Sequence, residues 1–176
     1  LYRRELREIF QVPVYAMNCL ATAVMFPLMA AILFFGGGAN SQLALLPEFL
    51  RLIPGALFAA CATALFALTG SMNVAVFTAV SREGKRHEFY RTLPVKPATQ
   101  LTAKLVMGLT LNLISSLPVA VLALFALPAF RAETVVGFLC GLLFTTGTST
   151  AALMIDVAHP RFGWKNETEA IKQNGI

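Results

Sequence analysis

Few residues of this 176-residue chain have the types and spacing that chemistry requires. The two histidines, His87 and His159, do not form the HExxH pair of an intramembrane metalloprotease, and we interpret them as ordinary interfacial residues. The sequence has no GxxxxGK[ST] phosphate-binding loop and no nucleophile with a nearby base. The three cysteines lack metal-ligand spacing, and we interpret them as small apolar packing residues: Cys19, Cys61 and Cys140. We therefore expect no catalytic residue, no metal site and no cofactor bound by this chain.

The polar segment 81–104, SREGKRHEFYRTLPVKPATQLTAK, has the composition of a contact surface. We expect Gly84 to end the helix before it and a short helix to follow from Lys85 to Thr92, ahead of Pro94. This helix would carry apolar side chains at Phe89, Tyr90 and Leu93 among basic ones. Such a helix suits a soluble partner protein. The alternative is that the basic charge only fixes membrane topology, although topology does not require the aromatic residues.

The second polar segment, residues 156–174, reads DVAHPRFGWKNETEAIKQN. Asn166 and Glu169 have the spacing of a capping box, which predicts a helix from about Glu167 along the membrane or into a further span. Phe162 and Trp164 fit an interfacial aromatic belt. An ordinary capped helix start with aromatic anchors explains much of this segment by itself.

Long uncharged segments must position these two polar segments. Hydrophobic residues make up 57% of the chain and charged residues 13%, about half the charged share of an average soluble domain. No charged residue occurs in 9–47, 52–81, 105–130 or 134–155. Runs of this length predict an all-α integral membrane protein and argue against a soluble domain, a disulfide scaffold or a disordered chain. The four predicted spans are 14–35, 54–80, 105–127 and 134–155, which form a transmembrane domain over 14–155, followed by the tail 156–176.

Residues 1–13 have the pattern of an amphipathic helix that lies in the membrane interface. Its apolar residues share one face, with the arginines mostly away from it: Tyr2, Leu6, Ile9 and Phe10. Pro13 separates this pattern from the first span. The alternative is that the segment is only the fraying start of that span.

Lys and Arg are unevenly distributed among the segments outside the spans. In order, 1–8, 36–52, 82–104, 131–133 and the tail hold 3, 1, 6, 1 and 3 of them. The positive-inside rule then places both chain ends and the 81–104 loop in the cytoplasm. This distribution accounts for the net charge of +5, and the loop lacks a basic stripe with stacking aromatics, so we expect no nucleic-acid partner.

The predicted spans contain small and polar residues but no ionisable group in their interiors, which disfavours a proton-coupled pump. Gly137 and Gly141 form a GxxxG pair that predicts close helix packing. Four polar residues are candidates for a translocation path, with helix packing the preferred role for each: Asn73, Asn112, Ser115 and Ser116. The last three precede Pro118 and can satisfy backbone groups freed by a kink there.

Together the two polar segments resemble a branch of the bacterial ABC-2-type exporter permeases. The first motif is SREGK…LPV: Ser81, Arg82, Glu83, Gly84, Lys85, Leu93, Pro94 and Val95. The second is D…P…W.NE.EA.KQN: Asp156, Pro160, Trp164, Asn166, Glu167, Glu169, Ala170, Lys172, Gln173 and Asn174. The opening RRELREIFQVPVY also resembles the amphipathic helix before the first span of such proteins. Lys96 departs from the small polar residue expected before Pro97.

The resemblance implies a permease subunit in the bacterial inner membrane that couples ATP hydrolysis by a separate subunit to substrate translocation. ATP and Mg²⁺ would then bind to that partner, an ATP-binding-cassette ATPase. The coupling contact would comprise Arg82, Glu83, Gly84, Lys85, Phe89, Tyr90, Arg91, Leu93 and Pro94. The chain begins at Leu1 and stops where relatives continue, so we expect a part of a longer permease, completed by further transmembrane helices or a second half. The alternative function is a non-transporting membrane scaffold or assembly subunit.

Overall fold

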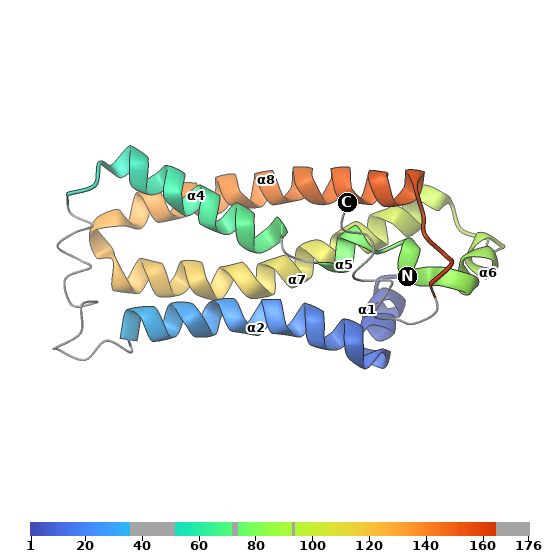
Figure 1. Cartoon of the computed structure of the whole chain (residues 1–176). Helices are drawn as coiled ribbons and strands as arrows, with labels where there is room; N and C mark the ends of the chain where they lie inside the picture. The colour runs from blue at the N-terminus through green and yellow to red at the C-terminus, as the bar shows by residue number, and fades with distance from the viewer. Residues whose placement is uncertain (36–51, 72–73, 93, 165–176) are drawn as a thin grey trace. The chain divides into compact units, whose positions relative to one another are not determined.

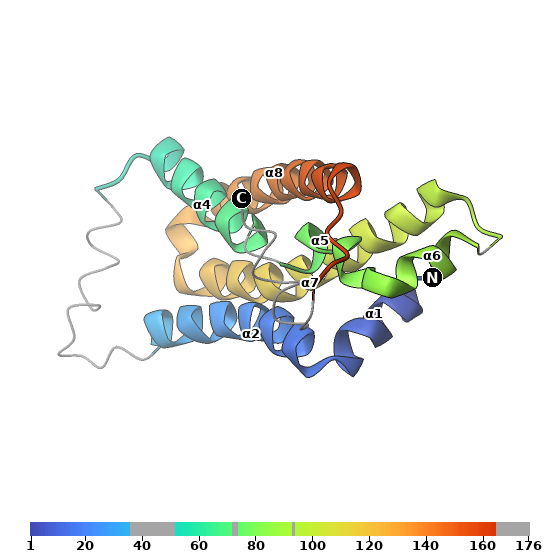
Figure 2. The same cartoon turned by 45° about the vertical axis from the view of Figure 1, so that its right-hand side comes forward.

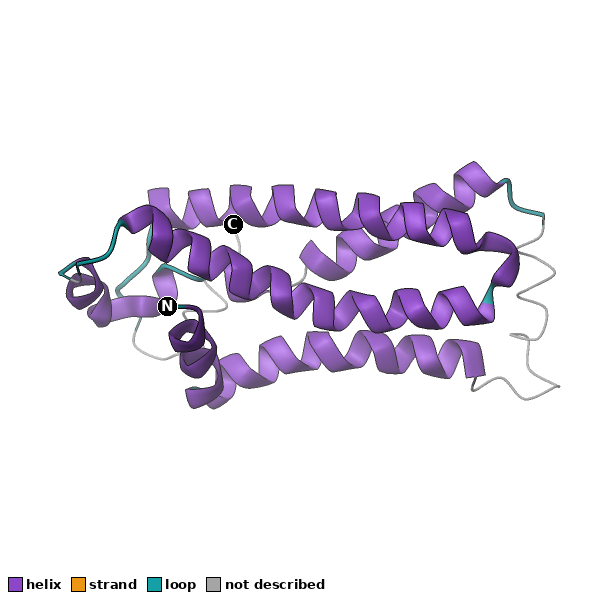
Figure 3. Ribbon diagram, turned by 180° about the vertical axis from the view of Figure 1, so that it is seen from behind, coloured by secondary structure: helices purple, strands orange, loops and turns teal. Residues whose placement is uncertain are grey.

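The computed structural model describes residues 1–35, 52–71, 74–92 and 94–164, and these residues form helices and loops without a strand (Figures 1 and 3). The elements follow in the order α1 (Tyr2–Gln11), α2 (Pro13–Phe35), α4 (Gly55–Ser71), α5 (Val74–Phe77), the 3₁₀ helix η2 (Ser81–Arg86), α6 (His87–Arg91), α7 (Pro97–Ala126), the 3₁₀ helix η3 (Pro128–Phe130) and α8 (Arg131–Ala158). The prediction of an all-helical protein is confirmed for this part of the chain.

Three of the helices are long and apolar enough to cross a membrane: α2, α7 and α8, with η3 continuing the last candidate back to Pro128. Proline occupies the first position of α2 and of α7, where its fixed φ suits a helix and its missing N–H is not needed. Pro27 and Pro118 lie inside continuous helices. Because α7 begins at Pro97 and α8 reaches Ala158, both helices extend beyond the predicted spans 105–127 and 134–155.

The predicted span 54–80 is not one helix. Helix α4 ends at Ser71 after 17 residues, α5 covers only Val74–Phe77, and residues 78–80 form turns. A physical reason lies in the turn, where the backbone N–H groups of Val80 and Ser81 donate to the side chain of Asp156 and not to helical carbonyls. With 17 residues, α4 is shorter than the three candidate spans and lies at the lower limit of about 17 residues for a transmembrane helix.

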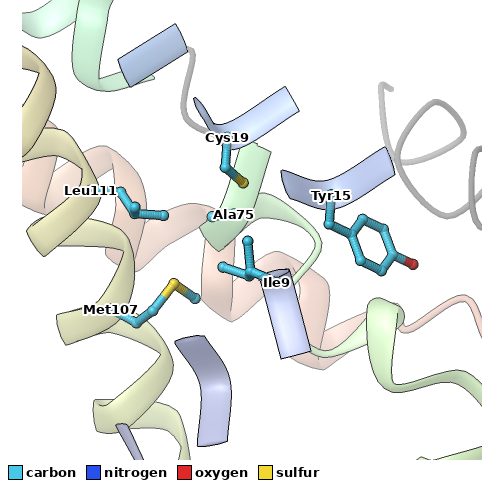
Figure 4. Packing of buried hydrophobic residues seen from close by; sticks show 6 residues of the cluster. All are labelled: Ile9, Tyr15, Cys19, Ala75, Met107 and Leu111. Atoms are coloured by element: carbon cyan, nitrogen blue, oxygen red, sulfur yellow. The ribbon is translucent and has the colours of Figure 1, made fainter. Parts of the chain in front are cut away.

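The chain divides into two compact units. The first comprises Leu1–Ala21, Asn73–Leu111 and Thr146–Ile176, and the second Thr22–Met72 and Asn112–Thr145. In the first unit, side chains from α1, α2, α5 and α7 form a small core, with Ala75 near its centre (Figure 4). Its buried members are Ile9, Tyr15, Cys19, Ala75, Met107 and Leu111.

In the second unit, α4 and α8 pack through glycines. A Cβ on Gly137 would lie 2.6 Å from Cβ of Ala62, and a Cβ on Gly141 would lie 2.5 Å from Cβ of Phe66. Helices can approach this closely only where one of them lacks side chains at the contact. The GxxxG pair therefore does lie at a helix–helix contact, as its spacing predicts.

Candidate functional site

The two polar segments of the sequence meet in the first unit, where Asp156 near the end of α8 binds the start of η2. The Asp156 carboxylate accepts hydrogen bonds from the N–H groups of Val80 (2.6 Å) and Ser81 (3.1 Å), and from the Ser81 hydroxyl. Both Ser81 and Asp156 are buried. Hydrogen bonds to a charged acceptor are stronger than neutral ones, so this carboxylate fixes the chain where it leaves the 78–80 turn.

The segment after α8 adds two further bonds to Ser81. The Arg161 backbone N–H donates to the Ser81 hydroxyl at 3.0 Å, and the Trp164 indole N–H donates to the Ser81 carbonyl at 3.0 Å. Residues 159–164 accordingly run beside η2 and α6 in both views of the chain (Figures 1 and 2). Ser81 thus uses its N–H, its hydroxyl and its carbonyl to hold the 156–164 segment.

Gly84 interrupts η2 at the point where the indole of Trp164 covers the backbone. Its φ of 51° and ψ of −129° lie outside the helical region, in a conformation that glycine adopts without steric cost. A Cβ at this position would lie 2.6 Å from Cζ2 of Trp164. The expected break at Gly84 is therefore present, and the structure gives it a second cause in the indole.

Lys104 joins three elements through its ammonium group, although it is only 2% exposed. Its Nζ lies 3.1 Å from Oε2 of Glu5, 2.8 Å from Oε1 of Glu83 and 3.0 Å from the carbonyl of Ala79. The ammonium thus forms ion pairs with both carboxylates, of Glu5 and of Glu83. Because a buried charge is costly unless it is paired, this cluster fixes α1 and η2 against α7.

Glu5 lies on the buried side of α1 and is the most enclosed carboxylate of the cluster. Burial raises the pKa of its carboxyl group, but the charges and hydrogen bonds of Lys104 and Arg4 outweigh burial and leave the pKa below its ordinary value. Arg4 contacts Oε1 of Glu5 at 2.9 Å. Glu5 is therefore ionised at neutral pH.

Two aromatic contacts complete the surroundings of η2. The ring of His87 stacks on Phe162 with centroids 4.5 Å apart, and its Nδ1 lies 2.7 Å from Oε2 of Glu83. The guanidinium of Arg82 lies 5.4 Å from the centre of the Tyr15 ring. A cation over an aromatic ring is attracted by the electron density of its face. Arg82 and Glu83, both expected in the coupling contact, are thus buried and contact residues of the chain itself.

Helix α6 is the exposed part of the segment. Phe89 is 65% exposed and Glu88 is also exposed. The backbone of Lys85, Tyr90 and Arg91 is described without their side chains, and Leu93 lies outside the described residues. Pro94 is exposed just after the helix. The expected helix over 85–92 is therefore shorter, covering His87–Arg91 after the 3₁₀ helix.

The structure brings together only part of the second motif. Asp156 and Trp164 bind η2, and Pro160 lines a pocket beside it. The remaining motif residues and the predicted capping box lie outside the described residues: Asn166, Glu167, Glu169, Ala170, Lys172, Gln173 and Asn174. Asn73, one of the four polar candidates in the predicted spans, also lies outside the described residues.

Asn112, Ser115 and Ser116 are buried in α7. The Ser116 hydroxyl donates to the Asn112 carbonyl at 2.8 Å. The side-chain amide of Asn112 has no hydrogen-bond partner within the described part of the chain.

Glu5, His87 and Lys104 are functional candidates that the sequence analysis missed. The available signal was the spacing of Glu5, which lies three residues after Tyr2 and four before Ile9 and so falls on the apolar face of α1. The extension of α7 to Pro97 also places Lys104, which was expected at the end of the 81–104 loop, within a helix long enough to span a membrane.

Among the described residues, no group of three or more His, Cys, Asp or Glu side chains is placed to hold a metal ion. Comparison of the chain with protein-family models, curated proteins and solved structures finds no match. The candidate site therefore rests on its own geometry.

Proposed function

We propose that this chain is a membrane-spanning permease subunit of an ATP-driven exporter, in which a separate ATP-binding-cassette subunit hydrolyses ATP. One observation carries the proposal: the two motif segments bind each other at Ser81, directly beside the exposed helix α6. Residues far apart in the sequence thus hold η2, which continues directly into α6 with its exposed aromatic side chain at Phe89. Aromatic anchors of this kind are typical of protein–protein contacts.

The contacts of η2 would transmit a displacement of α6 to the long helices. Asp156 connects η2 to α8 through hydrogen bonds. Glu83 connects it to Lys104 of α7, which in turn binds Glu5 of α1. Because these contacts are short and buried, η2 moves with α7, α8 and α1 and not independently of them. Closure of the ATPase would then change the arrangement of the spans.

In this proposal α2, α4, α7 and α8 are the four spans, and α1 lies in the interface of the bacterial inner membrane. Both chain ends and the 81–104 loop face the cytoplasm, as the distribution of Lys and Arg favours. The partners are the ATPase, the lipid bilayer, and further transmembrane helices or a second permease half.

The test is co-purification with the ATP-binding-cassette subunit and ATP turnover in the reconstituted complex. Alanine at Phe89, Tyr90 and Arg91 together is expected to weaken binding by about tenfold or more, because one truncated interface anchor can cost about 2 kcal/mol. The matched control replaces Lys85 and Arg86 by alanine, which would disturb orientation if the loop served topology alone.

Two outcomes separate the candidate functions. Loss of ATPase binding in the aromatic variant, with membrane insertion intact, supports the permease. Unchanged binding and turnover in that variant would contradict the coupling role and favour a scaffold or assembly subunit.

A further inference from the structure

A cavity of about 580 Å³ lies in the second unit, lined by side chains of α2, α4 and α7 and by the start of α8. Its buried part is formed by Phe66, Val119 and Ala123. Its open part is formed by Met29 and Leu65, which are 64% and 46% exposed. The cavity therefore opens on the apolar outer surface of these helices, the surface that would face lipid.

Water is a poor occupant of this cavity. Among the described residues that line it, Thr134 has the one hydroxyl group, which already donates to the Phe130 carbonyl at 2.8 Å. A buried water needs about two to four polar partners, whereas cavities lined by aliphatic and aromatic side chains stay dry and accept hydrocarbon. A void also forfeits dispersion contacts that an apolar occupant restores. The cavity therefore fits a hydrocarbon chain.

A positive charge lies next to one end of this cavity. Phe58 of the lining stacks on Phe130 with centroids 4.4 Å apart, and Arg131 directly follows Phe130. Arg131 is exposed, and its Nε donates to the carbonyl of Leu124 at 3.3 Å, which uses one donor of the guanidinium and leaves the others for an anion. Glu133, the other charged residue described in this unit, lies against the start of α4.

We propose that the cavity binds one acyl chain of a membrane phospholipid, whose phosphate group pairs with Arg131. A phospholipid combines the two chemistries that lie side by side here, because it joins a hydrocarbon chain to an anion that arginine recognises well. Of the proposed function, this inference uses only the location in a membrane. Neither the ATPase nor transport enters it.

The test titrates the full chain in detergent with three probes and counts the bound probes by native mass spectrometry. Oleoyl-lysophosphatidylglycerol has a chain and a phosphate, mono-oleoylglycerol has the chain alone, and glycerol phosphate has the head alone. We expect saturable binding of the first and about fivefold weaker binding of the second, the contribution of one arginine to an anionic lipid. Glycerol phosphate should not bind at these concentrations, and binding as tight as that of the lysolipid would overturn the proposal.

Cys61→Trp places a large side chain in the open part of the cavity and should weaken both chain-bearing probes about tenfold or more. The matched control is Cys140→Trp, because Cys140 is also exposed but belongs to α8 outside the lining. Ala123→Phe fills the buried part and is expected to act like Cys61→Trp, so that a folding defect in one variant leaves the other. Parental binding in the folded cavity variants, or equal losses in Cys61→Trp and Cys140→Trp, would overturn the proposal.

Arg131→Gln tests the phosphate contact separately. It should abolish the fivefold preference for the lysolipid and leave the binding of mono-oleoylglycerol unchanged. A preserved preference would contradict the pairing with Arg131. Because no ATPase is present in these titrations, they can fail or succeed independently of the coupling role proposed for α6.

Discussion

Asp156 and Ser81 are joined by two hydrogen bonds to one carboxylate, although 75 residues separate them in the chain. A third bond to the same carboxylate comes from the N–H of Val80. An amide in its place loses the negative charge and turns an NH₂ group toward a donor. We therefore expect Asp156→Asn to lower the free energy of unfolding by about 2 kcal/mol, the scale of a hydrogen bond to a charged group. Chemical denaturation in detergent, followed by circular dichroism, measures this.

Glu88→Gln serves as the matched control for that substitution, since it removes a carboxylate that is exposed on α6. It should change stability by less than about 0.5 kcal/mol. Equal stabilities of parent and Asp156→Asn would show that the carboxylate does not hold η2.

Gly84→Ala is expected to destabilise the protein by about 2 kcal/mol or more. Alanine disfavours the φ of 51°, and its Cβ would overlap the Trp164 ring. In a double-mutant cycle with Trp164→Ala, the overlap disappears while the backbone penalty remains, so the two substitutions should be less than additive. Gly163→Ala is the control, because a Cβ there meets nothing within 4 Å. Additive effects would place Trp164 away from Gly84.

Gly141→Leu is expected to separate α4 from α8. Even the first side-chain atom would lie 2.5 Å from Cβ of Phe66 and 3.3 Å from the carbonyl of Thr63. Overpacking of this kind costs about 1–3 kcal/mol and lowers the melting temperature accordingly. Gly147→Leu on the same helix meets nothing within 4 Å of its Cβ and should melt like the parent. A parental melting temperature for Gly141→Leu would exclude this contact.

Glu5 predicts a dependence of stability on pH. Its pKa is lowered from an ordinary value of 4.5, because Lys104 and Arg4 outweigh the effect of burial. The stabilisation is therefore complete above that ordinary value and is lost as the pH falls through the lowered one. Melting temperatures of the parent and of Glu5→Gln should differ most at neutral pH and approach each other as the pH falls below 4.5. A constant difference from pH 7 to pH 3 would contradict the pairing of Glu5 with Lys104.

The long helices could be predicted because their signal is local. Uncharged apolar runs indicate α2, α7 and α8 directly, and Gly84 alone suggests a break. The contacts at Ser81 could not be predicted. Its bond to Trp164 joins residues 83 positions apart, and helical periodicity reports only on residues within a few turns of each other. The same holds for Glu83, whose charge suggests an exposed residue until Lys104 is placed beside it. The turn at residues 78–80 was missed because residues 54–80 are uniformly apolar, and hydropathy does not register a turn.

The position of Lys104 on α7 sets the depth at which this helix can sit in a bilayer. Residues 97–104 of α7 form its first two turns and end at the buried ion cluster. The residues that remain, 105–126, number 22 and would extend about 33 Å at 1.5 Å per residue, against a hydrocarbon core of about 30 Å. In a bilayer the helix could therefore keep its first two turns among the headgroups and still cross, and Lys104 would then mark the boundary between the headgroups and the hydrocarbon core.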